Sequence, residues 1–267
     1  MKFIKPNLIT MGTGEPVLLL HSALSSKLQW YRLMNSLSKQ YLVIAPDFSG
    51  YGESPFPIDP ESFTIESEVR FIESLVSEII KPAQSFHLVG HSFGGVVALR
   101  MAFQNPQRIN SLTMYEPVAF HLLDEASEAG KNVLTMHDFI NQKVSEGNYL
   151  EAVECFVDHW SGKGIFSSFP REFREVMVKG MRKLHIENNM LKHETLLLED
   201  YRKITLPVCI IAGKKSPVEA RQVSEILSSN LSNCAMNWLD LGHMAPLNQP
   251  EAVNPIIESF IKRFSLC

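Results

Sequence analysis

One stretch of the chain places a serine between two glycines, in the order Gly90-His91-Ser92-Phe93-Gly94. An apolar run (FHLV) precedes it and a helical pattern (VVALRMAF) follows, so the sequence predicts a strand, a tight turn and a helix. In so tight a turn the residues two positions before and after Ser92 must lack side chains, as Gly90 and Gly94 do. Ser92 would stand at a helix N-terminus, which favours negative charge. These features predict a nucleophile; the alternative is a glycine-rich turn with an incidental serine.

Serine is a poor nucleophile without a base, and His243 is the best candidate for that base. It lies in Gly242-His243-Met244, after the last apolar run, where a loop at a strand end could point its ring into a cleft. Most of the other eight histidines fall in or beside predicted strands or in a helical segment, where packed or surface roles are expected. The alternative for His243 is a structural loop histidine. No histidine or cysteine has metal-ligand spacing, so no metal is expected.

The elements that must position these residues alternate between apolar runs and amphipathic stretches. This pattern is typical of a mainly parallel sheet covered by helices, an α/β fold. We expect strands at residues 17–21, 41–47, 86–91, 111–116, 208–213 and 235–241, with two weaker strands near residue 3 and over residues 8–11. Helices are expected at residues 27–38, 62–80, 93–104, 218–228 and 252–264.

Between residues 117 and 203 nothing in the sequence resembles a strand. The stretch carries helical patterns such as LEAVECFVDHW, separated by glycines and Pro170, and it is too long for a crossover loop. We therefore expect residues 1–116 and 204–267 to form the core and residues 117–203 to form a helical cap within the same structural domain.

The composition limits the kinds of partner and the cellular compartment that we expect for this protein. With 25 basic and 29 acidic side chains the net charge is −4, which argues against nucleic acid as a partner. No apolar run reaches the length of about 18 residues that a membrane span requires, and the first residues lack a secretory apolar core. The four scattered cysteines are typical of a reducing compartment. We expect a cytoplasmic protein with a small-molecule substrate and no membrane partner; no sequence feature predicts an oligomeric state.

Four motifs together resemble the α/β-hydrolase superfamily, in its subgroup with a helical cap: VLLLHSALSS, PDFSGYGES, GHSFGG and GHMAPLNQPE. The resemblance covers nearly the whole chain, and the order of serine before histidine agrees with it. It implies an eight-stranded, mainly parallel sheet with the cap inserted after the sixth strand. It also implies that Ser92 is the nucleophile, that His243 is the general base, and that the backbone N–H groups of Ala23 and Phe93 form the oxyanion hole. No cofactor is implied. Ser22 stands where the family usually has glycine.

The acid of the triad is where the chain departs most from the family. Members commonly carry aspartate after the seventh strand, whereas this chain has Ser216 there. We predict that Glu116 replaces it, because Glu116 ends the sixth strand at the same sheet edge as Ser92, and Pro117 directs the chain out of the sheet. Glu219 is the alternative acid, and Asp240 is expected within the last strand.

The resulting hypothesis is a serine hydrolase that cleaves a carboxylic ester or thioester of a small to medium apolar substrate through an acyl-enzyme. Carbon–carbon bond hydrolysis and cofactor-free peroxidase-type chemistry use the same triad and remain alternatives. The alternative from another class of protein is a ligand-binding sensor with little turnover. Serine at the nucleophile position disfavours epoxide hydrolase and haloalkane dehalogenase chemistry. The candidate pocket residues are Leu24, Phe120, Trp160 and Met244.

Overall fold

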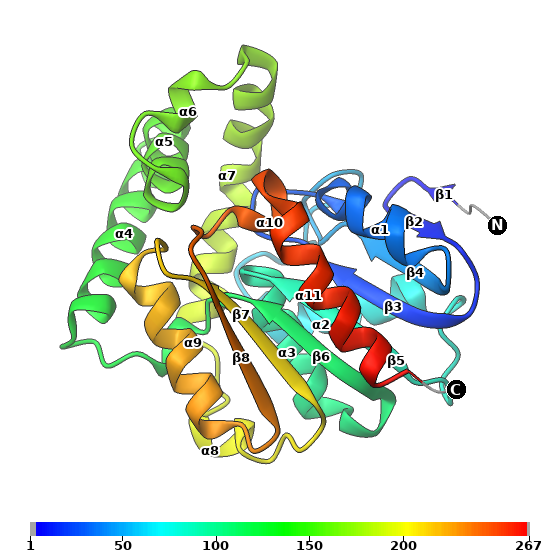
Figure 1. The fold of residues 1–267 in the computed structure, drawn as a ribbon. Coiled ribbons are helices and arrows are strands. Elements are labelled where there is room, and N and C mark those ends of the chain that lie inside the picture. Colours follow the sequence, from blue (N-terminus) through cyan, green and yellow to red (C-terminus); the bar gives the residue numbers. More distant parts are fainter. Residues whose placement is uncertain (1–3, 266–267) are drawn as a thin grey trace.

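The computed structural model describes residues 4–265, and within this range eight strands form one sheet (Figure 1). The strand order is β1-β2-β4-β3-β5-β6-β7-β8. The strands are β1 (Ile4–Lys5), β2 (Leu8–Met11), β3 (Glu15–Leu20), β4 (Tyr41–Pro46), β5 (Phe86–His91), β6 (Ile109–Tyr115), β7 (Val208–Gly213) and β8 (Cys234–Leu239). Residue 3, near which a weak strand was expected, lies outside the described residues.

The sheet is parallel from β4 through β8, and only β2 pairs in the antiparallel sense, with β1 on one side and β4 on the other. Successive residues of β3 are buried on opposite faces: Leu18 and Leu20 belong to one hydrophobic cluster, Val17 and Leu19 to another. Burial of both faces explains why the central strands are almost continuously apolar. The α/β fold expected from the sequence is confirmed.

Two groups of helices cover the two faces of the sheet. On one face lie η1 (Lys27–Trp30), α1 (Tyr31–Leu37) and α11 (Pro250–Arg263), which contribute Trp30, Leu33, Val253 and Ile257 to their cluster. On the other face lie α2 (Ile65–Val76), α3 (Phe93–Gln104) and α9 (Val218–Asn230). Figure 1 shows α11 crossing in front of the sheet and α2 and α3 behind it.

Helix α2 is shorter than the expected 62–80. It begins after Thr64, whose side chain accepts a hydrogen bond from the N–H of Ser67 and so caps the helix. At its end the N–H groups of Ile79 and Ile80 both bond to the carbonyl of Val76, which closes the helix in a turn. The apolar spacing continues through that turn, so periodicity alone overestimates the length of the helix.

The segment between β6 and β7 contains helices and no strand in the described structure. They are η3 (Phe120–Leu122), α4 (Glu128–Ser145), α5 (Tyr149–Ser161), α6 (Ile165–Ser168), α7 (Arg171–Lys192) and α8 (Leu198–Tyr201); a further short helix, η2 (Pro106–Arg108), precedes β6. In Figure 1, α5, α6 and α7 lie together beyond one end of the sheet instead of across its faces. We call residues 117–203 the helical insertion.

Candidate active site

Ser92 lies in a strained turn between β5 and α3, with φ 56° and ψ −117°. Two glycines allow this turn. A Cβ on Gly90 would lie 2.3 Å from the carbonyl oxygen of Gly94, and a Cβ on Gly94 would lie 2.4 Å from the carbonyl oxygen of His21. Ser92 therefore stands at the start of α3, where the first helical amides have no intrahelical acceptor.

His243 lies in the loop between β8 and α10 (Ala245–Asn248), and its ring is bound by Glu116. The distance between His243 Nδ1 and Glu116 Oε2 is 2.6 Å, and the other carboxylate oxygen, Oε1, accepts the N–H of Gly213 at 2.6 Å. Both side chains are buried. Because Nδ1–H donates to the carboxylate, Nε2 is the ring nitrogen that can accept a proton.

Backbone contacts also fix the position of Glu116. Glu116 has a φ of 42°, and its N–H donates to the carbonyl of Ile211 at 3.0 Å. Pro117 packs directly on Gly95, since a Cβ added to that glycine would lie 2.9 Å from the Pro117 Cβ. The chain thus leaves the sheet after β6 and passes over the start of α3, which brings Glu116 to the same edge as Ser92.

Leu24, Ser92 and Glu116 are the non-glycine residues of the described range 4–265 that have positive φ. Each such conformation costs about 1–3 kcal/mol and persists only where its surroundings enforce it. All three belong to segments that the sequence analysis assigned to the site: the oxyanion loop, the nucleophile turn and the acid. Backbone strain is therefore concentrated where the chemistry was expected.

The loop after β3, residues 21–24, is fixed by a buried histidine. His21 Nδ1–H donates to the carbonyl of Ser22 at 2.7 Å, and its Nε2 accepts the N–H of Phe48 at 3.0 Å. Burial lowers the pKa of His21 to about 4, so the ring is neutral near pH 7 and keeps both hydrogen bonds. His21 is thus a packed, hydrogen-bonded residue, as expected.

Gln29 links this loop to His243, a connection that the sequence analysis did not find. Ser22 donates both its N–H and its O–H to Gln29 Oε1, each at 2.9 Å. Gln29 Nε2 donates to His91 Nδ1 at 3.2 Å, and His91 Nε2–H donates to the carbonyl of His243 at 3.0 Å. Burial and the nearby His243 ring hold the pKa of His91 well below its usual value, so this relay is uncharged. No residue pattern in the sequence pairs Gln29 with His91.

The other positions considered for the acid of the triad form no hydrogen bond with His243 in the described structure. Glu219 is buried and hydrogen-bonded to His159 Nε2 of the helical insertion. Ser216, at the usual aspartate position, is buried and its hydroxyl has no hydrogen-bond partner. The expectation that Asp240 lies within the last strand is wrong: β8 ends at Leu239, and the exposed Asp240 side chain pairs with Lys215 Nζ at 3.0 Å.

A small cavity lies beside Ser92, between the core and the helical insertion. Its lining residues include the predicted oxyanion donors and several side chains of the insertion: Ala23, Ser92, Phe93, Val118, Phe120, Met136, His137, Phe156, Trp160, Leu184, Glu187, Asn188 and Leu191. Of the candidate pocket residues, Phe120 and Trp160 line it, whereas Leu24 and Met244 do not. The volume of about 20 Å³ suffices for one or two water molecules.

Trp160 of α5 brings the insertion into contact with the predicted base. Its ring centroid lies 4.2 Å from that of His243, with the planes inclined by 36°, and its ring is nearly parallel to that of Phe120, with centroids 6.2 Å apart. Because Trp160 covers the imidazole and lines the cavity, the insertion shields His243 from water on that side.

A buried ionic cluster also joins the insertion to the core, and the sequence analysis missed it. Lys183 Nζ of α7 lies 3.0 Å from Glu68 Oε2 of α2 and 3.0 Å from Glu187 Oε1 of α7. Tyr51 donates its hydroxyl to Glu187 Oε2 at 2.9 Å. Burial raises the pKa of Glu187 to about 7. On a helical pattern Lys183 looks like a surface residue; only the tertiary fold pairs it with Glu68.

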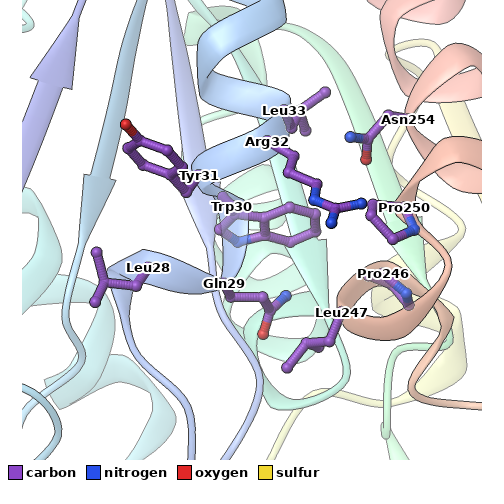
Figure 2. Close-up of a pocket in the computed structure, with 10 residues that line it drawn as sticks. All are labelled: Leu28, Gln29, Trp30, Tyr31, Arg32, Leu33, Pro246, Leu247, Pro250 and Asn254. Carbon is purple, nitrogen blue, oxygen red and sulfur yellow. The ribbon is translucent and has the colours of Figure 1, made fainter.

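A second hollow lies on the outer side of the core, between η1–α1 and α10–α11 (Figure 2). Figure 2 shows Trp30 at its centre, with Arg32 and Asn254 on one side and Leu28 and Leu247 on the other. Its volume is about 240 Å³, and none of Ser92, Glu116 and His243 lines it. The larger hollow is therefore separate from the predicted catalytic residues.

Two further features bear on cofactors and membranes. Across residues 4–265, no group of three or more His, Cys, Asp or Glu side chains is arranged to hold a metal ion. None of the helices in this range combines the length and apolar character needed to cross a bilayer.

Comparison with known proteins identifies the family. Residues 15–153 match the family described as the alpha/beta hydrolase fold, so the chain belongs to that family. It is 24% identical over 265 residues to 3-oxoadipate enol-lactonase 2 of Acinetobacter baylyi, covering 97% of this chain and 94% of that protein. It is 25% identical over 276 residues to monoacylglycerol lipase abhd6-A of Xenopus laevis, covering 94% and 76%.

Comparison with a solved structure supports the same fold for this chain. An esterase from Exiguobacterium antarcticum superimposes with a TM-score of 0.77 at 19% identity, covering 96% of this chain and 94% of that one. Relatives of this kind act on different substrates, so family membership indicates a hydrolase without defining what it cleaves.

Proposed function

We propose that this protein is a serine hydrolase that cleaves a carboxylic ester or thioester of a small to medium, largely apolar substrate. The observation that carries the proposal is the buried hydrogen bond between Glu116 and His243, at the same sheet edge as the strained Ser92. Membership of the alpha/beta hydrolase family supports the reaction class. Ser92 acts as nucleophile, His243 as general base and Glu116 as the acid that orients the imidazole.

In the first half-reaction His243 Nε2 accepts the proton of the Ser92 hydroxyl as Oγ bonds to the substrate carbonyl carbon. The carbonyl oxygen becomes an oxyanion, which accepts hydrogen bonds from the N–H groups of Ala23 and Phe93; one such donor typically contributes about 3 kcal/mol to the transition state. Glu116 stabilises the imidazolium through Nδ1–H. The tetrahedral intermediate then collapses, and the alcohol or thiol leaves with the proton from His243.

In the second half-reaction a water molecule takes the place of the leaving group. His243 removes a proton from it while its oxygen bonds to the acyl carbon, and the second tetrahedral intermediate forms in the same oxyanion hole. Collapse of this intermediate breaks the bond to Ser92 Oγ, which regains its proton from His243. The acid is released and the enzyme returns to its starting state.

The helical insertion serves in this proposal as a cap on a core formed by residues 1–116 and 204–267. Two features support that role: the contact of Trp160 with His243, and the cavity between insertion and core that Ser92 lines. A covering layer of this kind excludes water from the reacting groups until the acyl-enzyme must be hydrolysed. The cytoplasmic location inferred from the scattered cysteines stays a prediction.

The test is the turnover of short-chain nitrophenyl esters by the Ser92→Ala variant. The members of a triad act together, so loss of the nucleophile should lower kcat by at least about four orders of magnitude. Ser216→Ala is the matched control, since Ser216 is also a buried serine near the site but has no role in the proposed reaction. It should keep activity within a few-fold of the wild type.

Turnover by a folded Ser92→Ala variant within tenfold of the wild type would rule out the serine mechanism. A folded wild-type protein that cleaves no ester or thioester in a panel of increasing acyl length would instead favour the ligand-binding alternative.

A further inference from the structure

The cavity beside Ser92 is lined by three residues that each have an unpartnered buried polar atom. Trp160 Nε1, His137 Nε2 and Asn188 Nδ2 are shielded from solvent and have no hydrogen-bond partner in the described structure. All three residues line the cavity, and each side chain belongs to a residue at least nine-tenths buried. They come from α5, α4 and α7, so three separate helices of the insertion bring them together.

An unpartnered buried polar atom is costly, and natural proteins keep few of them. Three around one cavity therefore indicate that something other than the protein satisfies them. An indole N–H and an amide NH₂ can only donate hydrogen bonds. The group that satisfies Trp160 and Asn188 must consequently be an acceptor, and the neutral ring of His137 can supply either a donor or an acceptor at Nε2.

The charges around the cavity decide which kind of acceptor fits. Burial lowers the pKa of His137 to about 4, so this ring carries no charge near neutral pH. Among the described residues that line the cavity there is no lysine or arginine, and the one acidic residue is Glu187. Lys183, the cation of the buried ionic cluster, is already shared between Glu68 and Glu187. A carboxylate or phosphate on the substrate would thus be buried without a counter-charge.

We propose that Asn188, with Trp160 and His137, recognises a second oxygen of the substrate, an uncharged ether, keto or hydroxyl oxygen separate from the scissile carbonyl. The proposal rests on the serine hydrolase function above and specifies its substrate class. A largely apolar molecule with one such oxygen matches the remainder of the cavity lining, which includes Phe120, Phe156 and Leu184. Asn188 is thereby a specificity residue of the site.

The experiment compares pairs of esters that have the same shape and differ in one oxygen. On the acyl side the pair is nitrophenyl methoxypropanoate and nitrophenyl pentanoate. On the alcohol side it is methoxyethyl acetate and butyl acetate. For each pair the ratio of kcat/KM, oxygenated ester over plain ester, is measured in the wild type and in Asn188→Leu, which keeps the branch at Cγ but removes the amide donor.

The ratio should fall by about tenfold or more in Asn188→Leu for the pair whose oxygen reaches the cavity, because the variant loses one hydrogen bond that the plain ester never made. The intrinsic reactivity of the two esters cancels when the ratios of the variant and the wild type are compared, because both proteins act on the same two esters. Met136→Leu is the matched control, because Met136 lines the same cavity but has no hydrogen-bond donor. The kcat/KM ratio of this variant should equal that of the wild type. If Asn188→Leu does not fold, His137→Phe removes a polar atom of the same cluster and should lower the ratio in the same direction.

Unchanged ratios in both pairs for the folded variant, with Ser92 still labelled by a fluorophosphonate, would overturn this proposal and leave the hydrolase function standing. Failure of the folded wild type to react with the fluorophosphonate at Ser92 would overturn both.

Discussion

At the scale of single residues, the main departure from the pattern expected for the family is the position of the proposed acid. Glu116 directly follows β6, the strand next to the one that leads to Ser92, and Gly213, at the end of the neighbouring β7, donates its N–H to the Glu116 carboxylate. Neighbouring strands are only about 4.8 Å apart, so an acid one strand away from the usual position still reaches the imidazole. The longer side chain of glutamate suits that shift.

We predict that Glu116→Gln lowers kcat by at least a hundredfold, toward the roughly ten-thousandfold loss typical of a triad whose carboxylate is replaced by an amide. The amide could donate a hydrogen bond to Nδ1, which would place the ring proton on Nε2 and remove the base. Steady-state turnover of a short nitrophenyl ester measures the effect.

Glu219→Gln is the matched control, because Glu219 is also a buried glutamate that binds a histidine, His159. It should retain activity within a few-fold of the wild type. The opposite pattern, with Glu116→Gln active and Glu219→Gln inactive, would assign the acid to the segment after β7.

The sequence predicts Ser92, Glu116 and His243 as site residues because glycine spacing and strand ends are local features, and the structure places all three after strands at one edge of the sheet. The sequence does not predict Gln29, Lys183 or Asn188. Each of these depends on a contact between segments far apart in the chain, such as Gln29 with His91 or Lys183 with Glu68. Hydrophobic spacing describes which face of a helix is apolar, but it does not show which polar residues the tertiary fold buries.

At the scale of elements, the helical insertion must move for the proposed reaction to occur. The cavity beside Ser92 holds about 20 Å³, less than any ester substrate needs. Several polar contacts bind the insertion to the core, and two of them differ in exposure. Lys183 of α7 pairs with Glu68 inside the protein, whereas His159 of α5, which binds Glu219 of the core, has a side chain that is 28% exposed. Partly exposed pairs contribute little to stability.

We therefore predict that α4, α5 and α6 open more readily than the core. Amide hydrogen exchange, measured by mass spectrometry of peptides, should be faster in these helices than in β3 and β5. The exchange rate of α7 should be closer to that of the core strands. A slowly hydrolysed substrate analogue bound at Ser92 should reduce the difference. Equal protection of α4–α6 and the central strands would mean that the insertion is part of the rigid core.

Element by element, the sequence predicts strands better than helix ends. The central strands begin and end within two residues of their expected positions, because burial on both faces makes them continuously apolar. Helix α2 was overestimated, since its apolar spacing runs on into the turn after Val76. Helix ends depend on caps and turns, which periodicity does not describe.

At the scale of the whole molecule, the fold brings residues from distant parts of the chain to one edge of the sheet. Ser92 follows β5, Glu116 follows β6 and His243 follows β8, while the insertion between β6 and β7 supplies Trp160 and Asn188. The same edge collects the three strained non-glycine residues of the described chain. The architecture thus places the strained residues and the predicted triad at the same edge of the sheet.

The central claim is that Ser92 is an activated nucleophile, and covalent labelling tests it most directly. Intact-mass spectrometry of the folded protein after treatment with a fluorophosphonate should show a single added phosphonyl group, located on Ser92 by peptide mapping. The Ser92→Ala variant should remain unlabelled under the same conditions. A folded wild-type protein that stays unlabelled, or a label that persists in Ser92→Ala, would contradict the account.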